Sequence, residues 1–523
     1  MKIKKILFVI LFVFTLFSTG NVAFSTDLKE IQTKQHELSY LRHSNLSELV
    51  FFSGYDVYYD KKLQYNPKIR QLVKEFEGAE KLVEQSNVSV AYYEYRNILN
   101  KMEPNDFYYM TSAYRLSQLG YFSLAYLAMS KVQNREIWGK HINAIRKYFF
   151  PSIHLKVPEE VFLAGLYSDI VYNNLTDESL EKLEKSGNAI VKSDYASYLR
   201  SRAYYEQKKY KEALSEINRA ISSNSDNVNY KRFKAEILTA DGRTKEALNC
   251  LKPLLAEEIP FIMMVKDLDK IKYYSLSEST KDELLQKYYL AYYFYLNRDY
   301  PRAISELNML LLKGEYKNSP NLLGQIYLLT GNYRDAEKLY EKVLSNDKKA
   351  YYAHKGMGDI LLHREKFKEA LAEYKLAEKG LGKDVETLIA LCVTSFKTKE
   401  YRQAYKYLAK AQKAYGDNYK VLYLSSQIQK DFGKQNLLNS LEKNVFYPEG
   451  WLDMARDALD LNDTKSAEEY INTAAYITKN SPRYFYYKSL LDTANKNYDE
   501  ALTDINRAKQ IIIEQDGEGN EQI

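Results

Sequence analysis

Alanine recurs along this chain at every thirty-fourth position or close to it, and this period constrains the fold more than any other feature. Ala336, Ala370 and Ala404 follow one another at two identical steps. The same register, with one step shorter by a single residue, extends in both directions through the pairs Ala91 and Ala125, Ala213 and Ala247, Ala303 and Ala336, and Ala467 and Ala501. Self-similarity at one fixed period is typical of a repeat protein, in which each supersecondary unit stacks on the next.

Other residue types follow the same register. Gly324 and Gly358 are one period apart, as are Tyr340 and Tyr374. An aromatic residue stands three positions before many of the alanines, at Tyr210, Tyr300, Tyr333, Phe367, Tyr401 and Tyr498. Small residues let two helix backbones approach closely, and aromatic residues fill the gaps beside them. The pattern therefore predicts two antiparallel helices in each unit.

This pattern resembles the tetratricopeptide repeat, which has small residues at positions 8, 20 and 27 and large or aromatic ones at 11, 17 and 24. The resemblance implies an all-α superhelix, a solenoid of antiparallel helix pairs. The register predicts a signal peptide at 1–25, a helical cap at 26–71, two repeats at 72–139, an irregular helical segment at 140–193, two repeats at 194–261, an insertion at 262–283 that is an extra helix or a long loop, repeats at 284–447 with a degenerate last one, two repeats at 448–513, and a flexible tail at 514–523.

The segment at 1–25 has the pattern of a secretory signal. Lys2, Lys4 and Lys5 precede an apolar run at 6–17, which is too short to cross a membrane, since a membrane-spanning helix needs about 20 residues. Small residues before Thr26 predict cleavage there, and the alternative is an uncleaved anchor. No second long apolar segment follows, so we expect no integral membrane segment in the mature chain. We therefore expect an exported protein, periplasmic or extracellular.

The charge balance and the cysteines exclude two further classes of protein. The net charge of +6 falls to +3 without the three lysines of the signal, which gives no electrostatic argument for a nucleic-acid partner. Cys250 and Cys392 lie about four repeats apart, and in a solenoid each repeat touches only its neighbours. We therefore expect two free, buried thiols, and Cys392 occupies position 8 as a small packing residue.

No catalytic motif is present in the sequence. Metal-binding H-E-x-x-H, glycine-rich phosphate loops, the G-x-S-x-G turn and Cys/His clusters are all absent, and the six histidines are scattered. We expect no metal, no cofactor and no enzymatic activity. An enzyme with its site in the irregular segment is the alternative, and it would need a pocket of clustered titratable groups.

The resemblance also implies a partner-binding face, because in this family positions 2, 5, 9, 12 and 13 of the first helix line the concave surface. Tyrosine and arginine dominate interaction hot spots, although many of the 50 tyrosines are expected to serve as packing residues instead. The predicted partner-binding residues are Met110, Tyr114, Tyr198, Arg202, Tyr205, Arg232, Glu236, Tyr288, Tyr292, Tyr295, Asn321, Gln325, Lys355 and Asp359, with Arg456 and Tyr486 further along. Since Asp359 follows Lys355, we do not predict the lysine–asparagine carboxylate clamp of some family members.

A basic stripe is a second candidate surface. Arg402, Lys406, Lys410 and Lys413 share one face of a predicted second helix. Such a stripe is most often a solvated convex face, and the competing hypothesis is contact with an anionic envelope polymer or a lipid surface.

Taken together, these patterns predict a non-enzymatic scaffold that binds another protein or a peptide on its concave surface, in an envelope or secretion assembly. The alternative is a repeat protein that binds an envelope polysaccharide or peptidoglycan, since grooves rich in tyrosine can stack on sugar rings.

Overall fold

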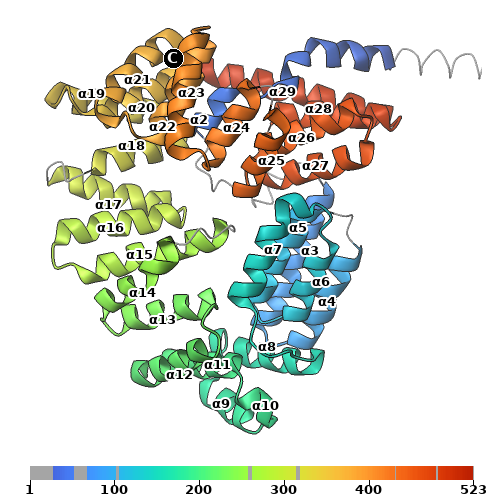
Figure 1. Cartoon of the computed structure of the whole chain (residues 1–523), viewed down its shortest axis with the longest axis vertical. Coiled ribbons are helices and arrows are strands. Elements are labelled where there is room, and N and C mark those ends of the chain that lie inside the picture. Colours follow the sequence, from blue (N-terminus) through green and yellow to red (C-terminus); the bar gives the residue numbers. More distant parts are fainter. Residues whose placement is uncertain are drawn as a thin grey trace, which may run out of the picture. The chain divides into compact units, whose positions relative to one another are not determined.

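The computed structural model describes residues 28–51, 67–101, 105–256, 262–313, 318–429, 432–478 and 481–521. Within these ranges every regular element is a helix, so the predicted all-α solenoid is confirmed (Figure 1). Residues 28–37 are helical, and they are followed by η1 (Ser39–Arg42), α2 (Leu46–Phe51), α3 (Pro67–Glu84), α4 (Val88–Lys101), α5 (Asp106–Gln118), α6 (Phe122–Lys131), α7 (Arg135–Phe149), α8 (Val157–Val171), α9 (Thr176–Glu184), α10 (Asn188–Val191), α11 (Asp194–Glu206), α12 (Tyr210–Ser223), α13 (Val228–Ala240), α14 (Thr244–Ala256) and α15 (Ile262–Ser279).

The remaining helices continue to the carboxyl-terminal end. They are α16 (Glu283–Leu296), α17 (Tyr300–Leu312), α18 (Ser319–Leu329), α19 (Tyr333–Asn346), α20 (Tyr351–His363), α21 (Phe367–Leu381), α22 (Val385–Lys397), α23 (Tyr401–Tyr415), α24 (Tyr419–Ile428), α25 (Gly433–Lys443), α26 (Pro448–Asp460), α27 (Thr464–Ile477), α28 (Pro482–Ala494) and α29 (Tyr498–Glu521). The stretch 514–521, expected to be flexible, thus continues α29. The signal segment at 1–25 lies outside the described residues.

The two helices of each repeat meet at the periodic small residues. Every alanine of the register is fully buried. Where the residue at position 8 has an O–H or S–H group, this group donates a hydrogen bond to the backbone carbonyl of the alanine at position 20. Ser201 Oγ donates to Ala213 O at 2.7 Å, and Cys392 Sγ donates to Ala404 O at 3.2 Å. Cys392 is therefore a buried packing residue, as expected. Both cysteines are free, but Cys250 is only half-buried, which differs from the prediction.

Replacing Ala370 with leucine is expected to lower the free energy of unfolding by about 1–3 kcal/mol, because the larger side chain overpacks the crossing of α20 and α21. Ala372→Leu is the matched control, since Ala372 lies exposed on the same helix and should change stability by less than about 0.5 kcal/mol. Thermal melting of both variants checks this. Equal melting temperatures would show that position 370 does not form the crossing.

The turn within each repeat has one recurring backbone conformation. Two positions before the second helix, the chain enters the left-handed region, for example at Gly331 (φ 78°) and Lys399 (φ 63°). The backbone N–H of the next residue then donates a hydrogen bond to the carbonyl oxygen five residues earlier, as Glu400 N–H does to Ser395 O at 2.8 Å. This bond satisfies a carbonyl at the end of the first helix and reverses the chain within three residues.

Two irregular stretches keep the helical architecture. The insertion after the repeat at 228 is an extra helix, α15, packed between α14 and α16. The segment at 140–193, expected to be irregular and helical, contains the end of α7, then α8 and α9, and the short α10. In the degenerate repeat, Leu438 is buried on α25 where other repeats have alanine.

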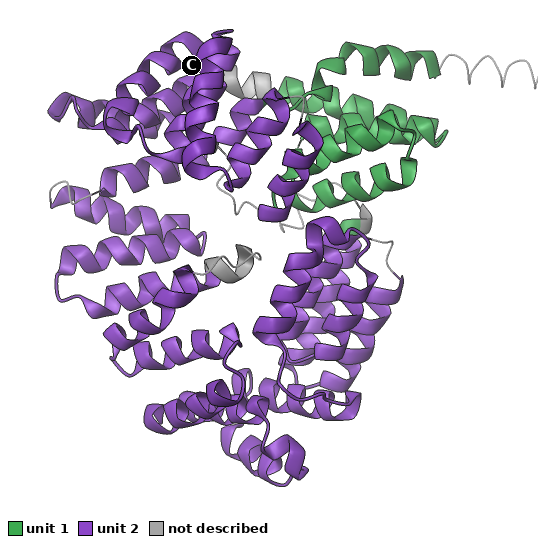
Figure 2. Ribbon diagram, in the orientation of Figure 1, with its two compact units in different colours: residues 1–45, 53–70, 446–523 green, residues 46–52, 71–445 purple. Residues whose placement is uncertain are grey.

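The chain divides into two compact units (Figure 2). Unit 1 comprises residues 1–45, 53–70 and 446–523, and unit 2 comprises residues 46–52 and 71–445. In unit 1 the amino-terminal helix packs on the last repeat through Ile31 and Leu38, and the amide nitrogen of Gln35 donates to Ser489 Oγ and Thr493 Oγ1, both at 2.9 Å. Residues 28–42 of the expected amino-terminal cap therefore cover the carboxyl-terminal repeats, whereas α2 contacts α20 and α22 within unit 2.

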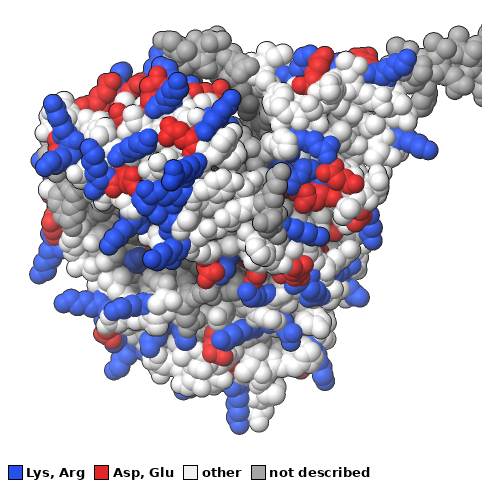
Figure 3. All heavy atoms as spheres, turned by 45° about the horizontal axis from the view of Figure 1, so that its top comes forward, with Lys and Arg blue, Asp and Glu red and all other residues white. Residues whose placement is uncertain are grey.

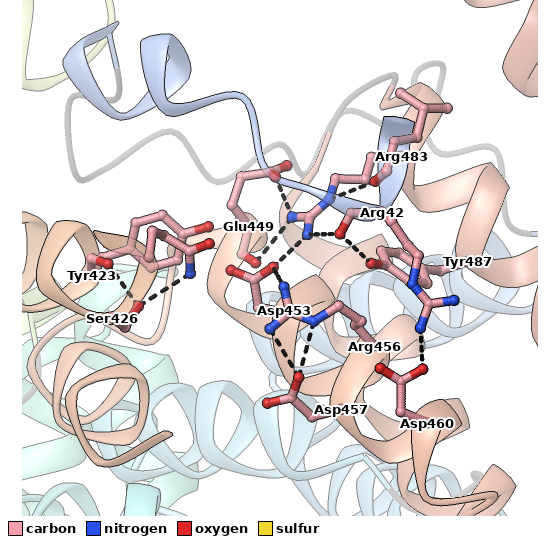
Figure 4. Close-up of polar contacts among 12 residues, drawn as sticks. Arg42, Tyr423, Ser426, Glu449, Asp453, Arg456, Asp457, Asp460, Arg483 and Tyr487 are labelled. Atoms are coloured by element: carbon pink, nitrogen blue, oxygen red, sulfur yellow. Dashed lines mark hydrogen bonds and ion pairs between the residues drawn. The ribbon is translucent and has the colours of Figure 1, made fainter. Parts of the chain in front are cut away.

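A buried ionic network holds the end of this cap in unit 1 (Figure 4). Arg483 pairs with Glu449 at 2.5 Å and with Asp453, and its Nε donates to the carbonyl of Leu41 at 3.0 Å. The hydroxyl of Tyr487 donates to the carbonyl of Arg42 at 2.8 Å, and the Arg42 side chain pairs with Asp460. Side chains of α26 and α28 thus fix the backbone of η1.

Within unit 2, the superhelix also brings remote helices together, contrary to the expectation that each repeat touches only its neighbours. The helix α7 contacts α25, where His141 Nε2 donates to the carbonyl of Glu442 at 2.8 Å. Burial lowers the pKa of His141 to about 4, so the ring is neutral at pH 7. The helix α7 also contacts α13, the first helix of a later repeat.

Candidate binding face

Six of the predicted partner-binding residues converge in unit 2 on the first helices α5, α11 and α13. They come from register positions 5, 9 and 12, which face the same side of consecutive repeats, and they are Tyr114, Tyr198, Arg202, Tyr205, Arg232 and Glu236. We call this set, with its neighbours Tyr167, Asn229, Phe233 and Asp267, the arginine–tyrosine cluster.

Arg202 lies flat between aromatic rings. Its guanidinium carbon is 3.9 Å from the centre of the Phe233 ring and 5.6 Å from that of Tyr198, and its Nε donates to the Tyr198 hydroxyl at 3.1 Å. Such stacking holds a planar cation in one orientation while leaving other N–H donors available. The Arg202 side chain is only half-buried.

Arg232 on the next repeat is held by polar side chains of its own helix. Its Nη1 donates to Glu236 at 2.7 Å and its Nη2 to Asn229 at 2.9 Å. These partners stand at i+4 and i−3, the spacing that places side chains together on a helix. Arg202 and Arg232 therefore project, each in a fixed position, from consecutive first helices.

Both guanidinium groups remain charged in this setting. Burial by itself would lower the pKa of Arg202, but Tyr198, Tyr167 and Glu236 raise it above the ordinary value. For Arg232, burial likewise lowers the pKa, and Glu236, Tyr198 and Asp267 together keep it above the ordinary value. Burial also raises the pKa of Tyr167 to about 12, so that hydroxyl stays protonated. The cluster can thus offer two permanent cations beside aromatic rings.

One side of the cluster is closed by the chain itself. The hydroxyl of Tyr114 on α5 donates to Asp267 on α15 at 2.9 Å, although the two residues are 153 positions apart. Tyr114 is consequently buried, and Met110, one turn before it, has no exposed surface. Tyr198 is buried among rings of its own and the next repeat, Tyr195, Tyr230 and Phe233. The accessible part of the cluster consists of its half-buried members, which are Tyr167, Arg202, Tyr205, Arg232, Glu236 and Asp267.

A second group of predicted residues lies on α16. The Tyr292 ring stacks on Tyr273 of α15 with centroids 4.7 Å apart and planes within 8°, and Tyr288 meets Tyr292 edge-on at 5.2 Å. Tyr288 is buried, whereas Tyr292 and Tyr295 keep part of their surface. Whether these tyrosines contact a partner remains a prediction.

The other predicted residues are not brought into either group. On α18, Asn321 is half-buried and Gln325 exposed. On α20, Lys355 Nζ donates to Asp359 at 3.0 Å, and the other oxygen of Asp359 accepts from the Tyr374 hydroxyl at 2.8 Å. The Lys355 ammonium group is therefore already paired with a carboxylate of its own repeat. In unit 1, Arg456 pairs with Asp453 and Asp457, and Tyr486 is buried.

Sequence reasoning missed four members of the cluster, for different reasons. Asn229 stands at position 2 of its repeat, so the register itself could have identified it. Tyr167 and Asp267 come from α8 and α15, which lie outside the register and have no assigned position. Phe233 looks like a core residue in the sequence, and it becomes part of the site only because Arg202 stacks on it.

Residues 197–250 and 321–384 match the family model described as "Tetratricopeptide repeat". These two segments are tetratricopeptide repeats. Such repeats generally mediate protein–protein interactions, and their fold is typically a non-enzymatic scaffold. Among the described residues no group of histidine, cysteine or carboxylate side chains could hold a metal ion. Nor is any helix in the described ranges both long and apolar enough to cross a membrane.

Solved structures of other proteins are similar to this chain at low sequence identity and low TM-score. The Cut9–Hcn1 hetero-tetramer of the APC/C is 11% identical, with 84% of this chain and 93% of that chain covered and a TM-score of 0.34. PilF of Pseudomonas aeruginosa is 15% identical, with coverages of 42% and 96% and a TM-score of 0.32. A tetratricopeptide repeat protein from Parabacteroides merdae is 15% identical, with coverages of 58% and 98% and a TM-score of 0.27. No curated protein matches the sequence.

Proposed function

We propose that this tetratricopeptide repeat protein is an exported, non-enzymatic scaffold that binds another protein or a peptide at the arginine–tyrosine cluster, within an envelope or secretion assembly. The observation that supports this most is the pair Arg202 and Arg232. Both guanidinium groups are oriented by neighbouring side chains and only half-buried. Fixed arginines beside aromatic rings suit carboxylates and backbone carbonyls of a bound segment. The proposed export rests on the amino-terminal sequence.

Removing both guanidinium groups is expected to weaken capture of the partner. The variant Arg202→Gln/Arg232→Gln should lose at least about tenfold in affinity, since a hot-spot arginine contributes about 2 kcal/mol or more and about 1.4 kcal/mol is tenfold. Affinity capture from the native envelope fraction, followed by titration of the identified partner, measures this. Circular dichroism must first show that the variant melts like the native chain.

The matched control is Arg219→Gln, because Arg219 is an exposed arginine on the second helix α12, and among the described residues its one ion-pair partner is Glu216 of the same helix. It should bind like the native chain. A partner held equally well by the cluster variant would place the binding surface elsewhere.

The tyrosines of α15 and α16 favour a second candidate function, the binding of an envelope polysaccharide or peptidoglycan. Tyr273 and Tyr292 present stacked rings, and Tyr295 lies beside them in edge contact with Tyr292. Aromatic faces bury the apolar face of a sugar ring at low entropic cost. In the same capture experiment, polysaccharide retained by the native chain and lost by Tyr292→Ala/Tyr295→Ala would favour this function over the scaffold.

A further inference from the structure

We propose that the outward face of α23 is a docking surface for an anionic lipid bilayer. Arg402, Lys406, Lys410 and Lys413 are all exposed and stand at i, i+4, i+8 and i+11, which places them along one side of the helix. At a rise of about 1.5 Å per residue the stripe is about 16 Å long. In Figure 3, lysine and arginine side chains gather at the upper left, over the part of unit 2 that contains this helix.

The charge of α23 differs from that of the preceding second helices of the same array. The helix α19 carries three basic and three acidic residues, and α21 also carries three of each, so both are neutral. The helix α23 carries four basic residues and no acidic one. Solvated faces normally intersperse both signs of charge, as α19 and α21 do. Solvation alone therefore does not account for the composition of α23.

One of the four cations of this stripe forms an ion pair with the neighbouring helix. Lys410 pairs with Glu378 of α21 at 2.8 Å, and the same carboxylate accepts a hydrogen bond from Tyr407 at 2.9 Å. Within the described ranges, no ion pair involves Arg402, Lys406 or Lys413. These three exposed cations are therefore available to an anionic surface.

Exposed tyrosines accompany the stripe and indicate which anionic partner fits it. Tyr401 is 48% exposed and Tyr405 is 49% exposed, and each precedes a basic residue of the stripe, Arg402 or Lys406. Tyrosine is favoured at the water–membrane boundary because its ring is apolar and its tip polar. A soluble polyanion offers the basic side chains a partner but offers these rings no apolar layer. The combination favours a lipid surface over an anionic polymer.

Sedimentation with vesicles tests this proposal. The purified chain is mixed with vesicles of phosphatidylcholine, with and without phosphatidylglycerol, at two salt concentrations. We expect binding to the anionic vesicles only, weakened by salt. Each basic residue near such a surface contributes about fivefold in partition, so Arg402→Gln/Lys406→Gln/Lys413→Gln should bind about a hundredfold less. Tyr401→Ser/Tyr405→Ser should also bind less while keeping the salt dependence.

The matched control removes three basic side chains from α19 instead, as Arg334→Gln/Lys338→Gln/Lys342→Gln. Every variant keeps the same amino terminus, so the apolar run at 6–17 contributes equally to all of them. The control should retain binding within a few-fold. The proposal is overturned if the two charge variants lose binding equally, if the α23 variant still binds, or if the chain binds polyphosphate but not the vesicles. The helix α23 lies outside the arginine–tyrosine cluster. The result of the vesicle experiment therefore does not depend on the result of the capture experiment that tests the cluster.

Discussion

Replacing Arg483 with methionine should lower the free energy of unfolding of the carboxyl-terminal repeats by about 3–5 kcal/mol. The substitution keeps the length of the side chain but removes the cation that serves Glu449 and Asp453, two carboxylates buried in unit 1. It also removes the donors to the carbonyls of Leu41 and Arg42. Breaking a buried pair from one side is costly because the remaining charge stays desolvated.

The loss of stability caused by Arg483→Met should also depend on pH. Burial raises the pKa of Glu449 while Arg483 opposes that shift, so removing the arginine raises the pKa further. A carboxyl whose folded pKa is raised stabilises the fold when protonated, and this contribution is lost as pH rises through the folded pKa. The difference in stability between the native chain and Arg483→Met should therefore be largest near neutral pH and become smaller as the pH falls toward 4.

Denaturant unfolding followed by tryptophan fluorescence measures this change. The chain has two tryptophans, Trp138 in unit 2 and the buried Trp451 in unit 1. A Trp138→Phe background therefore reports unit 1 alone. The matched control is Lys509→Met, because Lys509 pairs with Glu37 on the surface of unit 1 and both side chains are about half exposed. It should cost about 1 kcal/mol or less. Equal losses for the two variants would contradict a special role for Arg483.

The sequence was most informative wherever packing is local. The helices α11 and α13 begin at residues 194 and 228, α20 and α22 at 351 and 385, and α26 and α28 at 448 and 482, so each pair of first helices is spaced by the period of the alanines. This agreement arises because the small residues at positions 8 and 20 must meet within one helix pair. The repeat length is therefore a direct consequence of local geometry.

The candidate site was less predictable, because its accessibility depends on contacts between distant repeats. Tyr114 has the register position of a partner-binding residue, yet α15 covers it through Asp267. The covering helix comes from an insertion with no register, so no local pattern marks it. The same applies to the segment around Gln35, which packs against Ser489 at the other end of the chain. The position of a residue within its repeat predicts which face of the helix pair its side chain lies on, but it does not predict which distant segment of the chain packs against that face.

Replacing Gly356 with alanine is the second substitution expected to have a large effect, with a loss of about 3 kcal/mol in the free energy of unfolding. The Tyr340 ring is buried between two glycines of consecutive first helices. A Cβ at Gly356 would lie 2.2 Å from Cε2 of that ring, and a Cβ at Gly324 would lie 2.2 Å from its hydroxyl oxygen. The glycines therefore leave the space into which the tyrosine at position 24 fits, and an added methyl group must displace a ring that is close-packed on both sides.

Gly139→Ala provides the matched control, because Gly139 lies within α7 and a Cβ there would meet nothing within 4 Å. Alanine is favoured over glycine in a helix by about 0.5–1 kcal/mol, so the control should be neutral or stabilising. Thermal and denaturant unfolding of both variants measures the difference. The double variant Gly356→Ala/Tyr340→Leu should be less destabilised than the sum of its two single changes, since the smaller side chain vacates the space the methyl group needs. Additive losses would mean that Tyr340 and Gly356 do not share this contact, and that the spacing of the two helices is determined by other residues.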